Sequence, residues 1–215
     1  RAAALGRTFW RGALEAMGAP GDVPACLADL RSRGILLRRS PSRIVGDEEF
    51  VFKHALLRDV AYSRIGRDER AALHAAAAAW YDGLPAADEH LDARAEHHER
   101  AGDDRRAGDL RAMAAARAVA ARSDREAQVH FRAALNLLGD LPGHDIAPLT
   151  EGLADSLVRT GDWHAALALY AEMRLGVDDP GREAELRRKE AGAHDAHGAF
   201  EDALDALDEA EAAGP

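Results

Sequence analysis

The sequence predicts a mostly α-helical protein with one small β-hairpin near its beginning and a row of repeated helix pairs in its second half. Three observations lead to this prediction. Strand-like patterning is confined to residues 34–53, the rest of the 215 residues follows helical periodicity, and one small–large–small pattern of side chains recurs in the second half. The single cysteine excludes an intrachain disulfide, and no apolar run approaches the ~20 residues of a membrane-spanning helix.

The hairpin is predicted from two short apolar runs, residues 34–38 and 49–53, which flank a polar and turn-rich segment. Helices are expected around it. They cover residues 2–5, residues 10–17 with Thr8 as N-cap, residues 24–33 after Asp22, and residues 54–65, in which Leu56, Leu57, Val60 and Ala61 are expected to face the interior. Three helices followed by a two-stranded wing is the order of a winged helix, which we assign to residues 1–66.

Residues 67–104 are expected to connect this domain to the repeats. An alanine-rich helix is predicted over residues 67–81, and Gly83 and Pro85 are expected to end it. A further helix is expected near residues 91–100.

The remainder, residues 105–215, is predicted to consist of helix pairs. In three places a small residue is followed four positions later by a large one and three positions further by a small or medium one. These triplets are Ala127, Phe131 and Ala134; Ala166, Tyr170 and Met173; and Ala203, Leu207 and Ala210, whose first alanines are 39 and 37 residues apart. The pattern resembles the tetratricopeptide repeat, in which small residues let paired helices approach closely and the large residue fills the gap. We expect an α-solenoid of three pairs, over residues 105–138, 148–175 and 182–213.

The sequence lacks the motifs of common catalytic sites. It contains no GxxxxGK[ST] phosphate loop, no GxSxG, no HExxH and no CxxC. Two histidine groups have spacings that metal sites use, His97 with His98, and His194 with Asp195 and His197. Solvated polar helix faces explain both groups more simply. We therefore predict no catalytic residue, no metal and no cofactor within this chain.

The most informative segment is residues 49–62, where a predicted strand runs directly into a helix with His54 at the joint. Together with residues 5–10 and the Leu27-x2-Leu30-x3-Gly34 spacing, it resembles the region that follows the nucleotide-binding domain in signal-transduction ATPases with numerous domains. The likeness is greatest to large actinobacterial adenylate/guanylate cyclase-like and LuxR-type regulators. These proteins run from an ATPase domain through a winged helix to tetratricopeptide-like repeats. The resemblance implies that this chain, which begins with Arg1, is part of a longer protein that binds ATP or ADP.

The resemblance also implies a role for His54. Relatives carry a Met-His-Asp motif at the start of a helix, and its histidine contacts the β-phosphate of ADP. His54 stands in the place of that histidine and Asp59 matches a later aspartate, whereas Ala55 departs from the motif. An imidazole at a helix N-terminus lies where anions bind, so the role is chemically sensible. A helix-capping or core histidine is the alternative.

We therefore expect a non-catalytic regulatory and interaction module. Stacked helix pairs form a concave groove, and its expected lining is Glu151, Asp155, Arg159, Arg188 and Asp195. Residues 1–80 hold 13 basic and 9 acidic side chains, net +4, whereas residues 81–215 hold 15 and 29, net −14. The acidic second half favours a basic protein partner, or an effector domain of the same chain, over nucleic acid. We expect a cytoplasmic location and no membrane partner.

The alternative function is DNA binding, because winged helices often read DNA. The helix over residues 24–33 would then be the recognition helix, and the hairpin would contact the backbone. The arginines assigned to this role are Arg31, Arg33, Arg38, Arg39 and Arg43. Acidic residues in the same elements, Asp29 and residues 47–49, disfavour it.

Overall fold

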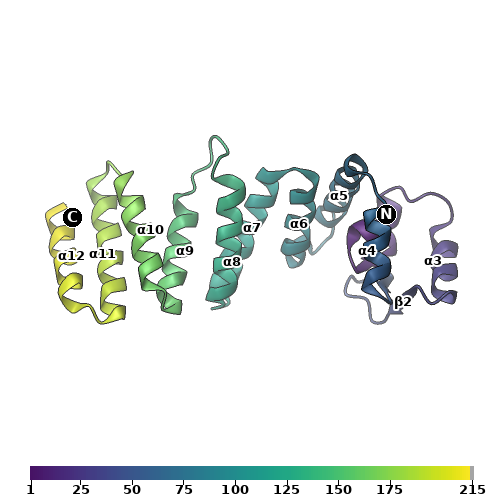
Figure 1. The fold of residues 1–215 in the computed structure, drawn as a ribbon, viewed down its shortest axis with the longest axis horizontal. Helices are drawn as coiled ribbons and strands as arrows, with labels where there is room; N and C mark the ends of the chain where they lie inside the picture. Colours follow the sequence, from purple (N-terminus) through teal and green to yellow (C-terminus); the bar gives the residue numbers. More distant parts are fainter. Residues whose placement is uncertain (214–215) are drawn as a thin grey trace. The chain divides into compact units, whose positions relative to one another are not determined.

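The computed structural model describes residues 1–213, which are mostly helical and include one small three-stranded antiparallel sheet (Figure 1). The chain divides within helix α7 (Asp104–Ala120) into two compact units, residues 1–107 and the part that begins at residue 108. Within residues 1–213, none of the helices has both the length and the apolar character that crossing a bilayer requires.

The sheet contains the predicted hairpin and one strand that was not predicted. Strands β2 (Leu36–Arg39) and β3 (Glu49–Phe52) pair antiparallel, and β1 (Thr8–Trp10) pairs with the other edge of β3. The prediction of a helix over residues 10–17 with Thr8 as its N-cap is therefore wrong at its start. Residues 8–10 instead pair with the edge of β3, and the side chains of Phe9 and Trp10 are only 0% and 4% exposed.

The helices of the first unit otherwise follow the sequence prediction. They are α1 (Ala2–Leu5), α2 (Arg11–Ala16), α3 (Val23–Ser32), α4 (Ala55–Ser63), α5 (Arg67–Asp82) and α6 (Leu91–Ala101), with the 3₁₀ turn η1 (Ala87–His90) before α6. Asp22 caps α3, because its side chain accepts a hydrogen bond of 2.9 Å from the backbone N–H of Ala25. Gly34 follows α3 with a φ of +69°, a conformation that glycine adopts without strain.

The core of the first unit is aromatic. The ring of Phe9 lies 5.8 Å from that of Phe50 and 5.4 Å from that of Phe52, measured between centroids. Leu73 and Tyr81 of α5 are buried in the same core. Helix α5 thus packs as part of the body that contains the sheet.

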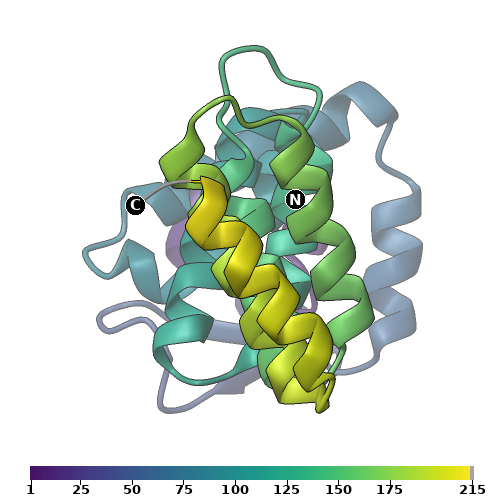
Figure 2. The same ribbon diagram turned by 90° about the vertical axis from the view of Figure 1, so that its left-hand side faces the viewer.

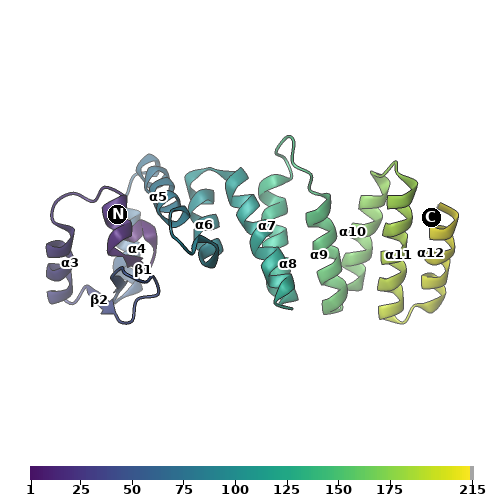
Figure 3. The same ribbon diagram turned by 180° about the vertical axis from the view of Figure 1, so that it is seen from behind.

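The second unit is a row of helices in which each packs against the next, as Figure 2 shows along the row and Figure 3 from its side. After α7 these are α8 (Asp124–Leu138), α9 (Ala147–Thr160), α10 (Trp163–Leu175), α11 (Pro180–His197) and α12 (Phe200–Ala213). Their positions agree with the helix pairs expected from the sequence.

Burial along the row follows the predicted triplets in two of three cases. Ala127 and Ala166 are fully buried, and the large residues after them, Phe131 and Tyr170, are only 7% and 2% exposed. The prediction that Leu207 fills the same gap is wrong, since 42% of its surface is accessible. Among the described residues no helix follows α12, so the side on which Leu207 lies is uncovered.

Candidate interaction surfaces

One face of α4 is apolar and exposed. Leu56, Leu57 and Val60 have 72%, 40% and 46% of their surface accessible, and Ala61 beside them is exposed as well. The prediction that these four residues face the interior is therefore wrong. We call them the α4 face.

Polar contacts orient α4. Arg58 Nε donates a hydrogen bond of 2.9 Å to the backbone carbonyl of Ala3, and its guanidinium lies 4.7 Å from the centre of the Tyr62 ring. The hydroxyl of Tyr62 lies 2.9 Å from Nε2 of His74 on α5. Because the packed side of α4 is held by an arginine and a tyrosine, its apolar side is turned outward. Apolar spacing alone does not reveal this reversal.

His54 stands at the N-terminus of α4 and is exposed. It is the N-cap residue by position, in extended backbone conformation, yet its side chain makes no capping hydrogen bond. Of the two alternatives that the sequence left open, neither the core role nor the capping role matches this placement. His54 therefore stands at the start of a helix, the kind of position where an anion is stabilised.

A buried chain of rings links α4, α5 and α6, and the sequence analysis missed it. His74 Nδ1 lies 2.8 Å from His97 Nδ1, and the opposite nitrogen of His74 meets the Tyr62 hydroxyl. The two histidines are 1% and 4% exposed. Burial, together with positive neighbours that include Arg100, lowers the pKa of each to about 4. Both rings are therefore neutral at pH 7.

Two residues predicted to line the groove, Glu151 and Asp155 of α9, are paired within the row. Glu151 forms ion pairs with Arg182 and, at 2.7 Å, with Lys189 of α11. Asp155 accepts hydrogen bonds of 2.8 Å from Lys189 and 2.6 Å from the Tyr170 hydroxyl. Burial alone would raise the pKa of Glu151, but the two cations outweigh it and the pKa falls. These carboxylates join three consecutive helices.

The structure does not bring the other three predicted groove residues into that network. Arg159 donates to Asp124 of α8 at 2.7 Å, so it joins a different pair of helices. Arg188 and Asp195 lie exposed on α11. Of the predicted lining, these two present their charges to solvent.

Most of the arginines assigned to DNA binding have a carboxylate partner in their own domain. The pairs are Arg33 with Asp29 at 3.4 Å, Arg38 with Glu48 at 2.9 Å, Arg39 with Glu49 at 3.6 Å and Arg43 with Glu49 at 3.2 Å. Arg31 is exposed on α3. A DNA phosphate that approaches any of these four paired arginines would therefore also meet the negative charge of a carboxylate.

Glu49 holds the hairpin loop to the sheet. Its side chain is 0% exposed and accepts hydrogen bonds of 2.8 Å from the backbone N–H of Arg43 and 3.2 Å from Nε of the same residue. Burial by itself would raise the pKa of Glu49, but these hydrogen bonds and the charge of Arg39 lower it below its ordinary value. The guanidinium of Arg43 also lies 5.3 Å from the ring centre of Trp10. The arginines of the hairpin thus have structural partners.

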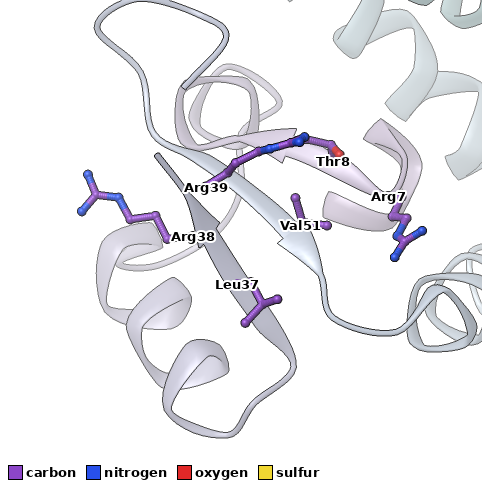
Figure 4. A pocket seen from close by; sticks show the side chains of 6 residues that line it. All are labelled: Arg7, Thr8, Leu37, Arg38, Arg39 and Val51. Atoms are coloured by element: carbon purple, nitrogen blue, oxygen red, sulfur yellow. The ribbon is translucent and has the colours of Figure 1, made fainter. Parts of the chain in front are cut away.

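The outer face of the sheet is hollowed beside these arginines (Figure 4). Thr8 and Leu37 both pair with Val51, so the three residues form one row across the strands. The hollow of about 460 Å³ is lined by Arg7, Thr8, Leu37, Arg38, Arg39 and Val51. In Figure 4, Arg7 and Arg38 point away on opposite sides, which leaves an apolar floor with a basic rim.

Within residues 1–213, no three His, Cys, Asp or Glu side chains are grouped so that they could hold a metal ion. His97 is buried against His74, and its neighbour His98 contacts Asp82 at 3.0 Å. The ring of His197 lies against that of Trp163, with centroids 4.6 Å apart and the ring planes tilted by 35°. The histidine groups of the sequence thus have ring and carboxylate partners.

No protein-family model and no curated protein matches the sequence. The structure is similar to the crystal structure of BtubC (BKLC) from P. vanneervenii, with a TM-score of 0.46 and 18% sequence identity. The match covers 74% of this chain and 68% of that one. At this level of similarity it carries no argument about function.

Proposed function

We propose that this chain is a non-catalytic regulatory and interaction module of a multidomain ATPase-type signalling protein. In this proposal residues 1–66 form a winged helix that passes on the nucleotide state of an ATPase domain. The tetratricopeptide-like pairs from residue 105 onward bind a protein partner or an effector domain. The ATP or ADP belongs to the ATPase domain, which this chain does not contain.

The α4 face is the observation on which this proposal rests. Three large apolar side chains exposed on nine helical residues are costly to leave in water, and such patches mark interaction surfaces. His54 stands at the N-terminal end of the same helix. A domain docked on the α4 face would lie beside this imidazole, so a bound nucleotide phosphate and the docking of α4 would be coupled.

The row of helices favours the second part of the proposal. Because each helix packs against the next, the row presents an extended surface, the kind of surface that solenoids use for protein partners. The exposed charges of Arg188 and Asp195 remain open to such a partner, whereas Glu151 and Asp155 serve the row itself.

The test uses the longer protein that carries the ATPase domain. His54→Ala should speed ADP release by about tenfold or more, because a hydrogen bond to a charged phosphate contributes roughly 1.5–3 kcal/mol. Leu56→Glu should do the same by weakening docking of α4. His164→Ala, at another exposed histidine, is the control and should change nothing. Unchanged ADP release in both α4 variants would contradict the proposal.

A further inference from the structure

Two hollows flank the exposed leucine of strand β2. Leu37 is 51% exposed and lies between the hollow of about 460 Å³ over the outer face of the sheet and a second hollow of about 520 Å³ between β2 and α3. The second hollow is lined by Ala28, Arg31 and Ser32 of α3 and by Leu36, Leu37 and Arg38. Because Leu37 and Arg38 line both hollows, the two linings form one surface, which we call the β2 surface.

The middle of the β2 surface is apolar. Leu37 pairs with Val51 in the sheet, and Figure 4 shows both side chains on the outer face. A partner side chain that covers Leu37 would remove exposed apolar surface from water. Both hollows also have volumes within the range of pockets that bind ligands. The middle of this surface therefore suits large apolar side chains.

The charge of the β2 surface has one sign. Every charged side chain that the described residues place around the two hollows is an arginine, namely Arg7, Arg31, Arg38 or Arg39. Arg38 and Arg39 already pair with Glu48 and Glu49. Arg7 and Arg31 are exposed, and within residues 1–213 neither has a carboxylate at ion-pair distance. These two arginines are therefore the ones that an anionic partner can pair with.

Arg7 and Arg31 lie on opposite sides of the apolar middle. Arg7 directly precedes β1 at one edge of the sheet, whereas Arg31 lies on α3, which borders β2 at the other edge. Neighbouring strands are about 4.8 Å apart, so β1 and β2 are separated by about 10 Å. A partner that reaches both arginines therefore carries negative charges at two places, at least about three extended residues apart, with apolar groups between them.

This pattern fits an acidic peptide segment better than the two other classes of partner. A DNA strand carries a phosphate at every nucleotide, so its charges would also fall on the apolar middle and on the paired arginines. A second copy that made the same contact in return would bring these arginines toward their own equivalents, and like charges repel. A peptide can place carboxylates at the two ends and apolar side chains in the middle.

We propose that the β2 surface is a docking site for an acidic segment of a partner protein, in which large apolar side chains are flanked on both sides by Asp or Glu. The apolar side chains cover Leu37 and Val51, and the carboxylates pair with Arg7 and Arg31. None of these four residues belongs to α4. The inference therefore depends neither on the α4 face nor on the role proposed for His54.

The test uses three labelled peptides. The probe is Glu-Glu-Ser-Leu-Phe-Leu-Ser-Glu-Glu with fluorescein at its N-terminus. We expect it to bind the chain saturably at low salt, with a Kd below about 100 µM in fluorescence anisotropy. One control peptide has serine in place of Leu-Phe-Leu, and the other has glutamine in place of every glutamate. Each control peptide lacks one required feature and should bind at least tenfold more weakly.

Variants of the chain place the probe on the β2 surface. Leu37→Ser should weaken binding of the probe at least tenfold, and its unfolding temperature should stay close to that of the wild type because the residue is exposed. Arg7→Gln and Arg31→Gln should each weaken binding about twofold to fivefold, since an exposed ion pair contributes little, and together about tenfold.

Two matched control variants change similar residues outside the β2 surface. Val45→Ser replaces an apolar residue of the hairpin loop that is 98% exposed. Arg64→Gln replaces an exposed arginine at the end of α4. Both variants should bind the probe as tightly as the wild-type chain does.

Several results would overturn the proposal. They are a lack of saturable binding by the probe, equal binding of the probe by Leu37→Ser and the wild type, and equal affinity for the probe and either control peptide. Displacement of the probe by duplex DNA would assign the surface to nucleic acid instead. Concentration-dependent dimerisation in analytical ultracentrifugation that Leu37→Ser abolishes would assign it to a second copy of this chain.

Discussion

Two buried histidines connect the helices of the first unit, and their titration makes its stability depend on pH. The pKa of His74 and of His97 is about 4 in the folded chain, against 6.5 for an unperturbed histidine. The unfolded chain therefore binds more protons between these values. The contribution of the two neutral histidines to the free energy of unfolding is fully present above pH 6.5 and is lost progressively as the pH falls toward 4.

We predict that the free energy of unfolding of the first unit falls by several kcal/mol between pH 7 and pH 4. A lowering of the pKa from 6.5 to about 4 corresponds to roughly 3 kcal/mol for one histidine. Because the two rings share one hydrogen bond, the contributions of the two histidines do not simply add. Urea denaturation across this pH range is the measurement. His97→Phe should flatten the dependence, whereas the exposed His164→Ala should leave it unchanged. An equally steep dependence in His97→Phe would contradict the assignment.

The same repeat position differs in burial between two pairs, which gives a matched test. Tyr170 is 2% exposed and Leu207 is 42% exposed. Tyr170→Ala should cost about 3–5 kcal/mol in chemical denaturation. Leu207→Ala should cost less than about 1 kcal/mol, because the site is open. A loss below about 1 kcal/mol for Tyr170→Ala would place Tyr170 at the surface and break the register.

At the scale of the helix, close packing in the row depends on glycine. A methyl group on Gly152 of α9 would overlap the ring of Phe131, whereas the open space around Gly192 of α11 accepts one. Gly152→Ala should therefore cost about 1–3 kcal/mol. Gly192→Ala should be neutral or stabilising by up to about 1 kcal/mol, since alanine favours the helix. Thermal denaturation of the two variants compares them directly, and equal unfolding temperatures would contradict this packing.

Substitutions on α4 and α5 test whether the α4 face is exposed or buried within the chain. Leu56→Glu should change the free energy of unfolding by no more than about 0.5 kcal/mol, because the residue is 72% exposed. Leu73→Ala on α5, where the leucine is 5% exposed, should cost about 2–5 kcal/mol. A large loss of unfolding free energy for Leu56→Glu would mean that the α4 face is turned to the interior, as the spacing of its apolar residues alone suggested.

The helix pairs of the second unit were predictable because small and large residues recur with a fixed spacing, and because Gly161 and Gly198 end helices at matching places. The orientation of α4 was not, since an apolar stripe indicates that a face is suited to burial but not what covers it. Strand β1 was missed because residues 8–10 are too few to show a period of two. The pairing of Lys189 with Asp155 joins residues 34 positions apart, which local patterns do not encode.

On the scale of the whole chain, charge is distributed unequally. The first 80 residues carry a net charge of +4 and the rest −14, counted from 13 against 9 and 15 against 29 charged side chains. The basic excess falls in the part of the chain for which the sequence predicts a winged helix, yet most of the arginines assigned to DNA binding are paired with carboxylates. The α4 face is an exposed apolar surface of this part of the chain, and such a surface suits a protein partner.

Whether the chain recognises proteins rather than nucleic acid is tested most directly by titration with generic duplex DNA at low salt, followed by fluorescence anisotropy. Low salt maximises the phosphate contribution, so even non-specific binding of about 10⁻⁶–10⁻⁴ M is detectable. We predict no binding in this range. Binding that weakens steeply as salt is added, and that is lost when Arg31 and Arg38 are replaced by alanine, would contradict the proposed function and establish the DNA-binding alternative.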